Sequence, residues 1–463
     1  MKQKITLILL LLFSGVPAFS QSSYIDSLFT GYFQRTQGWT GGDATISIPL
    51  PDGRTMWLFG DSYIDHYDSS DNTLPCLFQV RNCFTVQDAV NLNQMITYID
   101  STKTGIDQTY FKLGTVGNNV YWPGHGFVKD DTVFIFLEKY NGTNYDYLGQ
   151  NIAKVLLPSF KLLSITTLPL MNNLHMGKAV IYDDTSGYYY IYGNKLNWIV
   201  YEPYVARTKF ENLVSGNWEF YAGTDWTPIP VLAKKISGEI VSPGFSVVKI
   251  KGVYHLITQD NGYLTCGLGR NIYSYSSSAP AGKFQSPRLL YTVKDQINGH
   301  YLLTYNATAH PEFIENDELL IAYNVNDMVD TLAPDVCPSQ CKHPFTDRWI
   351  ADSYRPKFVR VPYSVMGIKS GTGLQGVEVE PNPAFEMLTV HLNSETRQPV
   401  TITFMNKMGK VFLQQHNVIL NAGHNELQLN LSTLSPDIYL MVVHQVDQSG
   451  TQPLWEPKII LKN

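Results

Sequence analysis

The chain has 463 residues, a formal net charge of −6 and no cluster of basic residues, which excludes an extended nucleic-acid-binding surface. Aromatic residues make up 13% of the chain, with 29 Tyr and 8 Trp beside 34 Gly and 25 Pro. This composition favours strands and tight turns over helices, and the length allows two or three domains.

Residues 1–20 have the three-part pattern of a signal peptide. Lys2 and Lys4 precede an apolar run over 5–12, and the small residues Ala18 and Ser20 suit a cleavage site. The apolar run is too short to cross a bilayer, so we expect no membrane-spanning segment. We expect the mature chain to begin near Gln21.

Residues 22–363 carry a repeating unit and no long helical periodicity. Each copy is an apolar strand, a polar turn and a second apolar strand that ends in a polar residue. The copies lie at 42–61, 124–138, 175–194, 243–260 and 310–324. Five such hairpins, each with room for two more strands, predict a five-bladed β-propeller.

Polar side chains recur at equivalent positions of this repeat. In a propeller the first strand of each blade lines the central channel, and the second strand returns to the same rim. The first strands begin with Asp43, His125, His175 and His310. The second strands end with Asp61, Glu138, Asn194, Asp260 and Asn324. We therefore expect a funnel lined by carboxylates, imidazoles and amides.

Asp43 and Asp61 are the predicted catalytic pair, because glycosidic bond cleavage needs one protonated and one ionised carboxyl group across the scissile bond. They end adjacent strands of one hairpin, and Glu138 takes the position of Asp61 in the next blade as a third catalytic carboxylate. The structural alternative for each Asp alone is a turn or a cap.

Further polar residues are predicted to bind substrate. They are His125, His175, Arg207, Asp260, His310, Asn194 and Asn324. For a single histidine, a role in the core or rim is the alternative, and Arg207 could simply form a structural ion pair. The tryptophans Trp57, Trp122, Trp218 and Trp226 are either stacking walls for sugar rings or parts of the core.

The five cysteines suggest two disulfides that staple loops, Cys76 to Cys83 and Cys337 to Cys341, with Cys266 as a buried thiol. No HExxH or CxxC spacing indicates zinc, so we expect no cofactor and assign no metal ligands. Binding of a calcium ion by oxygen ligands in the channel is an alternative that the sequence leaves open.

The first hairpin resembles a known family. Residues 38–43 (GWTGGD), 50–61 (LPDGRTMWLFGD) and 354–360 (YRPKFVR) are similar to bacterial propellers described as domains of unknown function 5005 and 4185. The second group includes endo-acting D-arabinan hydrolases. This resemblance implies a glycoside hydrolase, with Asp43 and Asp61 as its two aspartates, that acts on an arabinan-like or other polysaccharide.

Residues 364–378 are rich in Gly and Ser, which is typical of a linker. Short alternating strands over 379–463 then predict a small β-sandwich. The ordered motifs 381–383 (PNP), 409–410 (GK), 431–434 (LSTL), 438–440 (IYL) and 458–462 (KIILK) resemble the C-terminal sorting domain of the type IX secretion system of Bacteroidetes. One departure is Asp437, where that family usually has Gly.

These observations favour a secreted or surface-attached glycoside hydrolase, exported through the periplasm and outer membrane by the type IX machinery. Its partner is then a polysaccharide or oligosaccharide, with no nucleic acid. The alternative is a non-catalytic propeller that binds glycans at the cell surface. A protein-binding propeller is a third hypothesis.

Overall fold

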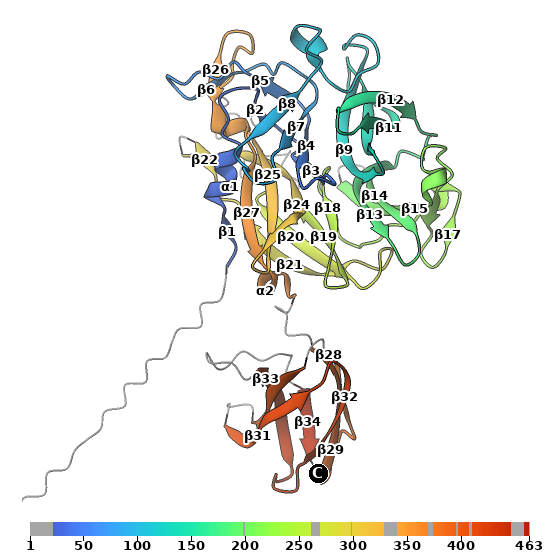
Figure 1. Ribbon diagram of the computed structural model, residues 1–463, viewed down its shortest axis with the longest axis vertical. Helices are drawn as coiled ribbons and strands as arrows, with labels where there is room; N and C mark the ends of the chain where they lie inside the picture. The colour runs from blue at the N-terminus through green and yellow to red at the C-terminus, as the bar shows by residue number, and fades with distance from the viewer. Residues whose placement is uncertain are drawn as a thin grey trace, which may run out of the picture. The chain divides into compact units, whose positions relative to one another are not determined.

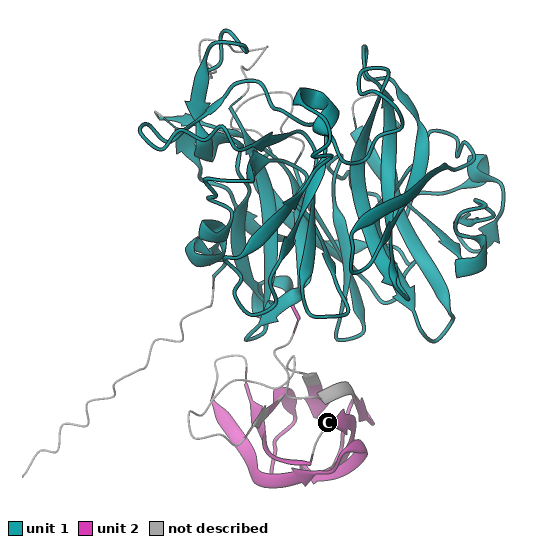
Figure 2. Cartoon of the chain, turned by 45° about the horizontal axis from the view of Figure 1, so that its top comes forward, with its two compact units in different colours: residues 1–366 teal, residues 367–463 magenta. Residues whose placement is uncertain are grey.

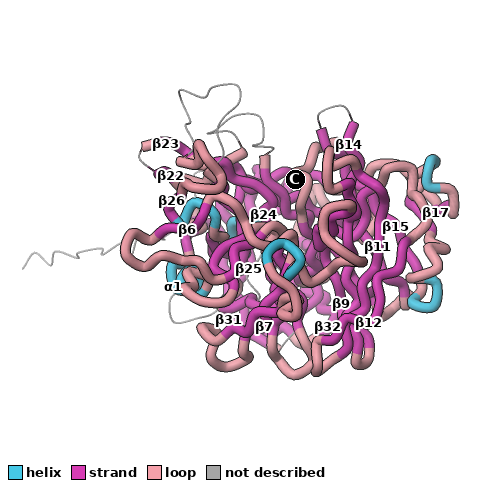
Figure 3. Tube along the Cα trace, turned by 90° about the horizontal axis from the view of Figure 1, so that it is seen from above, coloured by secondary structure: helices cyan, strands magenta, loops and turns pink. Residues whose placement is uncertain are grey.

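The computed structural model describes residues 22–197, 200–260, 269–297, 299–327, 340–368, 374–394, 397–406, 410–445 and 458–462. The predicted signal peptide lies outside these residues. The chain divides into two compact units, Met1–Met366 and Gly367–Asn463 (Figure 2). Strands dominate both units, and the helices are few and short (Figure 3).

Five sheets of four or five strands build the first unit (Figure 1). The first contains β3 (Ile46–Pro49), β4 (Thr55–Phe59), β7 (Cys83–Gln87) and β8 (Met95–Tyr98). The second contains β9 (Asn119–Lys129), β10 (Thr132–Asn141), β11 (Tyr147–Leu156) and β12 (Lys161–Thr167). The third contains β13 (His175–Asp183), β14 (Tyr188–Asn197), β15 (Val200–Thr208), β16 (Glu219–Tyr221) and β17 (Trp226–Thr227).

The fourth sheet contains β18 (Ser246–Ile250), β19 (Val253–Gln259), β20 (Asn271–Ser277) and β21 (Gln285–Thr292). The fifth joins β24 (Leu303–Glu315), β25 (Glu318–Asn326) and β27 (Lys357–Pro362) to the N-terminal strand β1 (Tyr24–Ile25). Both ends of the propeller unit therefore contribute to one sheet, with Tyr24 opposite Arg360.

The first strands of the five sheets contact one another in a closed ring. β9 lies against β3 and β13, β18 lies against β13 and β24, and β24 returns to β3. Each sheet is a meander that runs outward from this ring. The predicted all-β propeller is confirmed.

Both faces of these sheets pack against neighbouring sheets, which explains the continuous apolar runs in the sequence. All five residues of β4 are buried. Ile48 and Leu58 of the first sheet share a core with Val133 and Ile135 of the second. The hairpins of the repeat are thus the innermost strand pairs of the sheets.

Short elements connect the sheets and cover their edges. Asp26 is the N-cap of the helix α1 (Ser27–Tyr32), and its side chain accepts a hydrogen bond of 2.8 Å from the backbone N–H of Phe29. The other short elements are β2 (Trp39–Gly42) with β5 (Ser62–Ile64), β6 (Thr73–Pro75) with β26 (Arg348–Ile350), β22 (Gln296–Ile297) with β23 (His300–Tyr301), α2 (Tyr363–Met366), and the 3-10 helices Gly105–Gln108, Phe210–Asn212, Pro230–Leu232 and Ala351–Tyr354.

Both predicted disulfides, Cys76 to Cys83 and Cys337 to Cys341, are wrong. Cys76 pairs with Cys341, because β6 and β26 bring these two distant segments together. Cys83 is a free thiol on β7, buried in an apolar core. Cys337 and Cys266 lie outside the described residues.

The second unit is a small β-sandwich, as predicted. One sheet contains β28 (Leu374–Glu380), β29 (Met387–Ser394) and β32 (Gly423–Asn430), and the other contains β31 (Val411–Leu420), β30 (Gln398–Met405), β33 (Asp437–Gln445) and β34 (Lys458–Lys462). Leu388, Val390 and Phe404 are among the buried residues of its core. Among the described residues, no helix is long and apolar enough to span a membrane.

Candidate active site

A cavity of about 600 Å³ opens among the inner strands of the propeller. Residues from all five sheets or their connections line it. They are Asp43, Ala44, Ile46, Gly60, Trp122, Pro123, Gly124, Glu138, Tyr140, Lys178, Leu196, Tyr201, Pro243, Gly244, Phe245, Asn306 and Thr308. Two of these, Asp43 and Glu138, are predicted catalytic residues. A third, Trp122, is one of the tryptophans predicted to be a stacking wall or part of the core.

Asp43 directly follows β2 and lines the cavity. Its Oδ2 accepts a hydrogen bond of 3.1 Å from the hydroxyl of Tyr305 on β24. Burial raises the pKa of Asp43 to about 6, against the hydrogen bonds from Tyr305 and Tyr354, which lower it. Asp43 therefore binds its proton more tightly than an exposed Asp does.

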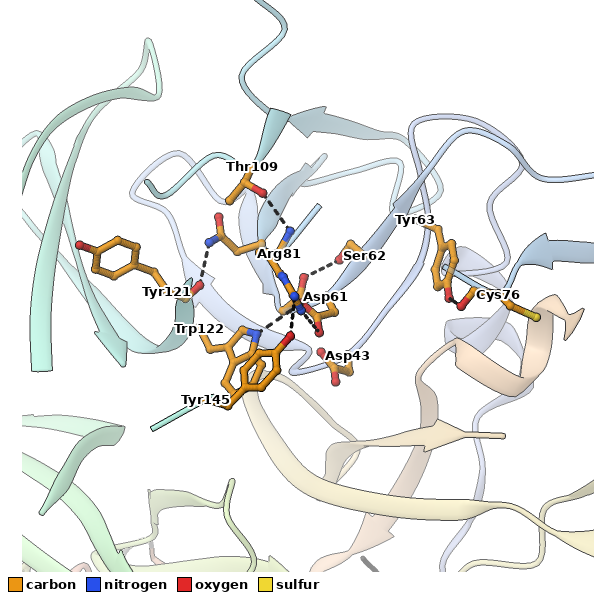
Figure 4. Close-up of polar contacts among 12 residues, drawn as sticks. Asp43, Asp61, Ser62, Tyr63, Cys76, Arg81, Thr109, Tyr121, Trp122 and Tyr145 are labelled. Carbon is orange, nitrogen blue, oxygen red and sulfur yellow. Dashed lines mark hydrogen bonds and ion pairs between the residues drawn. The ribbon is translucent and has the colours of Figure 1, made fainter. Parts of the chain in front are cut away.

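Asp61 follows β4, and its side chain lies next to that of Asp43 (Figure 4). Arg81 approaches Oδ2 of Asp61 to 3.3 Å, and the indole N–H of Trp122 lies 3.4 Å from Oδ1. Burial and the negative charge of Asp43 raise the pKa of Asp61 to about 7. Arg81 and Trp122 act in the opposite direction, because they stabilise the carboxylate.

The antiparallel pair of β2 and β5 brings these two carboxyl groups together. Gly42 stands opposite Ser62, so the residues that adjoin this pair, Asp43 and Asp61, meet at one point. The backbone N–H of Gly60 also donates a hydrogen bond of 3.0 Å to the carbonyl of Asp43. A β-carbon at Gly60 would lie 2.4 Å from Oδ1 of Asp43, so only glycine leaves room for this arrangement.

The segment after Asp43 has an unusual backbone. Ala44 has φ of 73° and Thr45 has φ of 52°, and a β-branched residue rarely adopts this left-handed conformation. The hydroxyl of Thr45 donates a hydrogen bond of 2.8 Å to Oδ1 of the buried Asn324. Asn324, predicted to bind substrate, thus holds the strained segment that aims Asp43 into the cavity.

Glu138 lies in the cavity wall with a different set of partners. It forms an ion pair with Lys178, and Nδ1 of His175 lies 3.6 Å from its Oε2. Burial alone would raise the pKa of Glu138, but Lys178 and His175 outweigh burial and hold the pKa well below its usual range. Glu138 is therefore ionised throughout the neutral range and does not store a proton for an acid step.

His125 and His310 lie on the inner strands β9 and β24 but do not line the cavity. Nδ1 of His310 is 2.7 Å from the hydroxyl of Ser47, and its ring contacts Trp57. Burial lowers the pKa of His125 to about 4 and that of His310 to about 3. Both imidazoles are therefore neutral near pH 7.

Arg207, Asp260 and Asn194 also lie outside the cavity lining. Arg207 pairs with Glu219 at 2.8 Å and lies over the rings of Tyr188 and Trp226, in the outer part of its sheet. Asn194 donates a hydrogen bond of 2.8 Å to the carbonyl of Pro243, which ties the third sheet to the fourth. Asp260 pairs through its backbone with Asn271. These contacts are structural.

Sequence reasoning missed Arg81, Tyr305 and Lys178. Arg81 lies in an irregular connection between Cys76 and Cys83, where no repeat position marks it. Tyr305 precedes the predicted start of the fifth repeat, although β24 already begins at Leu303. Lys178 follows closely after His175 within the third repeat, so a closer reading of that strand start could have found it.

No group of three or more His, Cys, Asp or Glu side chains in the described part of the chain is placed to hold a metal ion. The side chains in and beside the cavity include two adjacent carboxyl groups with raised pKa values, an ionised Glu138 and several aromatic rings. This combination defines a propeller with a carboxyl pair at the edge of its cavity.

Comparison with protein-family models identifies the class. Residues 26–373 match the family described as Domain of unknown function (DUF5005), and the chain belongs to this family. Residues 378–455 match the Secretion system C-terminal sorting domain. A search of the curated proteins finds no match.

Several solved structures are similar to this chain. A proposed hydrolase from Bacteroides ovatus ATCC 8483 is 23% identical with a TM-score of 0.58, over 74% of this chain and 92% of that chain. The GH43_1 enzyme from Xanthomonas citri complexed with xylose is 11% identical with a TM-score of 0.41, over 73% and 93%. An exo-1,5-α-L-arabinanase from a bovine ruminal metagenomic library is 9% identical with a TM-score of 0.39, over 70% and 95%.

The C-terminal domain determines where the protein goes. A sorting domain of this kind directs export by the type IX secretion system, so the protein is secreted or displayed at the cell surface.

Proposed function

We propose that this protein is an exported glycoside hydrolase that cleaves an arabinan-like or other polysaccharide with Asp43 and Asp61. The observation that carries the proposal is the pair of adjacent carboxyl groups with raised pKa values, of which Asp43 lines the cavity and Asp61 lies beside Asp43 and the cavity-lining Trp122. Retaining and inverting glycosidases share the need for two such groups. The similar fold of a proposed hydrolase supports the same reaction class.

We propose that the two groups divide the acid and base roles, because the charge on one raises the pKa of the other and the pair therefore keeps one proton over a range of pH. Asp61, with a pKa of about 7, keeps its proton at mildly acidic pH and donates it to the oxygen of the leaving sugar. Asp43, with a pKa of about 6, loses its proton first. It acts on the anomeric carbon as a nucleophile, or takes a proton from the water that attacks this carbon.

Glu138 takes a binding role in this proposal. Its ion pair with Lys178 presents a charged acceptor beside a charged donor in the cavity wall, and sugar hydroxyls both donate and accept hydrogen bonds. We propose that this pair binds hydroxyl groups of the sugar whose bond is cleaved.

The test is hydrolysis of a panel of arabinans and of plant and algal glycans, measured by released reducing ends. We expect Asp43→Asn and Asp61→Asn each to lower kcat at least about a hundredfold on the glycan that the wild type cleaves. The matched control is Asp52→Asn, because Asp52 lies in the turn of the same hairpin and pairs only with Arg54.

Two outcomes would contradict the proposal. Full activity in both Asn variants would remove these residues from the catalytic step. Measurable glycan binding by the wild type, with no reducing ends released from any glycan, would favour the non-catalytic glycan-binding propeller.

A further inference from the structure

Tyr145 lies at the turn between β10 and β11 in a conformation that a bulky residue rarely adopts. Its φ is 58°, and an aromatic residue pays a conformational cost for this value. The backbone N–H of Tyr145 donates a hydrogen bond of 3.0 Å to the carbonyl of Asn141, and the Asn141 side chain accepts one of 2.8 Å from Thr143. The turn is therefore held in place, and with it the direction of the Tyr145 side chain.

The ring of Tyr145 rests on the wall of the cavity and stays open to solvent. Its plane lies within 3° of that of Trp122, with 5.8 Å between the ring centroids. The side chain is nevertheless 42% exposed. Because Trp122 lines the cavity, Tyr145 places a partly exposed aromatic surface beside the cavity.

Arg81 joins this surface to Asp61 (Figure 4). Its guanidinium donates to the hydroxyl of Tyr145 and lies 3.3 Å from Oδ2 of Asp61. The same guanidinium lies over the rings of Phe78, at 4.5 Å, and of Tyr145, at 5.3 Å. The stacked rings of Trp122 and Tyr145 thus form an aromatic wall beside Asp61, and the guanidinium of Arg81 links this wall to the ring of Phe78.

The position of this aromatic wall beside Asp61 indicates which sugar of the substrate contacts it. In the proposed function Asp61 protonates the oxygen of the leaving sugar, so that sugar lies on the Asp61 side of the scissile bond. We propose that Tyr145, supported by Trp122, is the subsite on which the leaving-group sugar stacks. The substrate is then an oligosaccharide or polysaccharide with at least one sugar on that side, an inference that rests on the proposed function.

The test separates binding of the leaving sugar from the chemical step. One substrate is the oligosaccharide that the wild type cleaves. The other is the glycosyl fluoride of the sugar whose anomeric carbon is attacked, in which fluoride takes the place of the leaving sugar. We expect Tyr145→Ala to lower kcat/KM about tenfold on the oligosaccharide, mainly through a higher KM. The kcat/KM of this variant on the glycosyl fluoride should equal that of the wild type. Tyr145→Phe, which keeps the ring, should retain most of the wild-type kcat/KM.

The matched control is Tyr182→Ala. Tyr182 is 55% exposed and its ring also contacts another aromatic ring, that of Tyr189, but it lies at the opposite end of β13 from His175. We expect wild-type values on both substrates. Thermal unfolding of all variants checks that they are folded.

Several results would overturn the inference. Equal losses on oligosaccharide and fluoride would mean that Tyr145 acts through Asp61 or through the fold, and unchanged kcat/KM on both would mean that it does not contact the sugar. Either result leaves the proposed function standing if the wild type is active. A wild type that hydrolyses no glycan would overturn the proposed function and the subsite together.

Discussion

At the scale of single residues, the two aspartates differ in their neighbours and therefore in their protonation. Asp61 lies beside the guanidinium cation of Arg81 and the indole of Trp122, whereas Asp43 accepts a hydrogen bond from the neutral hydroxyl of Tyr305. Both carboxyl groups are nevertheless easier to protonate than exposed ones, because burial penalises their charged forms. This leaves a pH interval in which one group is protonated and the other is ionised.

We predict a bell-shaped dependence of kcat/KM on pH, centred between about 6 and 7. The acidic limb reports protonation of Asp43, and the alkaline limb reports loss of the proton from Asp61. Arg81 lowers the pKa of Asp61, so Arg81→Gln should move the alkaline limb to higher pH and leave the acidic limb in place. Initial rates of both proteins across the pH range measure this. A shift of the acidic limb to higher pH, with the alkaline limb in place, would reverse the assignment, because Asp61 would then be the group that is ionised in the active enzyme.

At the scale of elements, the pair β2 and β5 positions the site more than the repeat hairpin does. Asp43 and Asp61 lie just outside β3 and β4, and the pairing of Gly42 with Ser62 sets their distance from each other. The left-handed backbone of Ala44 and Thr45 then turns the chain from β2 into β3. Strain at this segment is maintained by the contact between Thr45 and Asn324.

Gly60→Ala tests this arrangement. The added methyl group would lie 2.4 Å from Oδ1 of Asp43, so this carboxyl group must move from its place beside Asp61 or the backbone at position 60 must shift. We expect at least about a tenfold loss of kcat with an unchanged circular dichroism spectrum. Gly31→Ala is the control, because a methyl group there meets nothing within 4 Å. Wild-type activity of Gly60→Ala would show that the close approach of Gly60 to Asp43 is unimportant.

At the scale of the whole molecule, contacts between distant parts of the chain close the propeller unit. β1 pairs with β27, and the Cys76–Cys341 disulfide ties the connection after β6 to the connection after β25, 265 residues further along the chain. The disulfide, which is covalent, also restricts the unfolded chain over a long loop, where a cross-link has its largest entropic effect.

Removing this disulfide by Cys76→Ser with Cys341→Ser should lower the free energy of unfolding by about 3–5 kcal/mol. Chemical denaturation of the two proteins measures the difference. Adding a reductant should destabilise the wild type by a similar amount and leave the double variant unchanged. Equal stability of the oxidised wild type and the double variant would contradict the expected effect.

The sequence predicted the fold class well, because the alternation of apolar strands and polar turns is a local property of the chain. The same pattern located Asp43, Asp61 and Glu138 at strand ends, and the motifs of the tail identified a sorting domain. It misjudged the partner of Cys76, since Cys341 reaches it only through the pairing of β6 with β26.

Local sequence therefore determined which residues form strands and which polar groups stand at their ends. Only the tertiary structure decided what each polar group does: Lys178 keeps Glu138 ionised, Ser47 engages His310, and Tyr305 and Arg81 separate the environments of the two aspartates. The physical reason is that protonation and contact depend on burial and on neighbouring charges, and these neighbours come from distant positions in the sequence, most of them on other blades of the propeller.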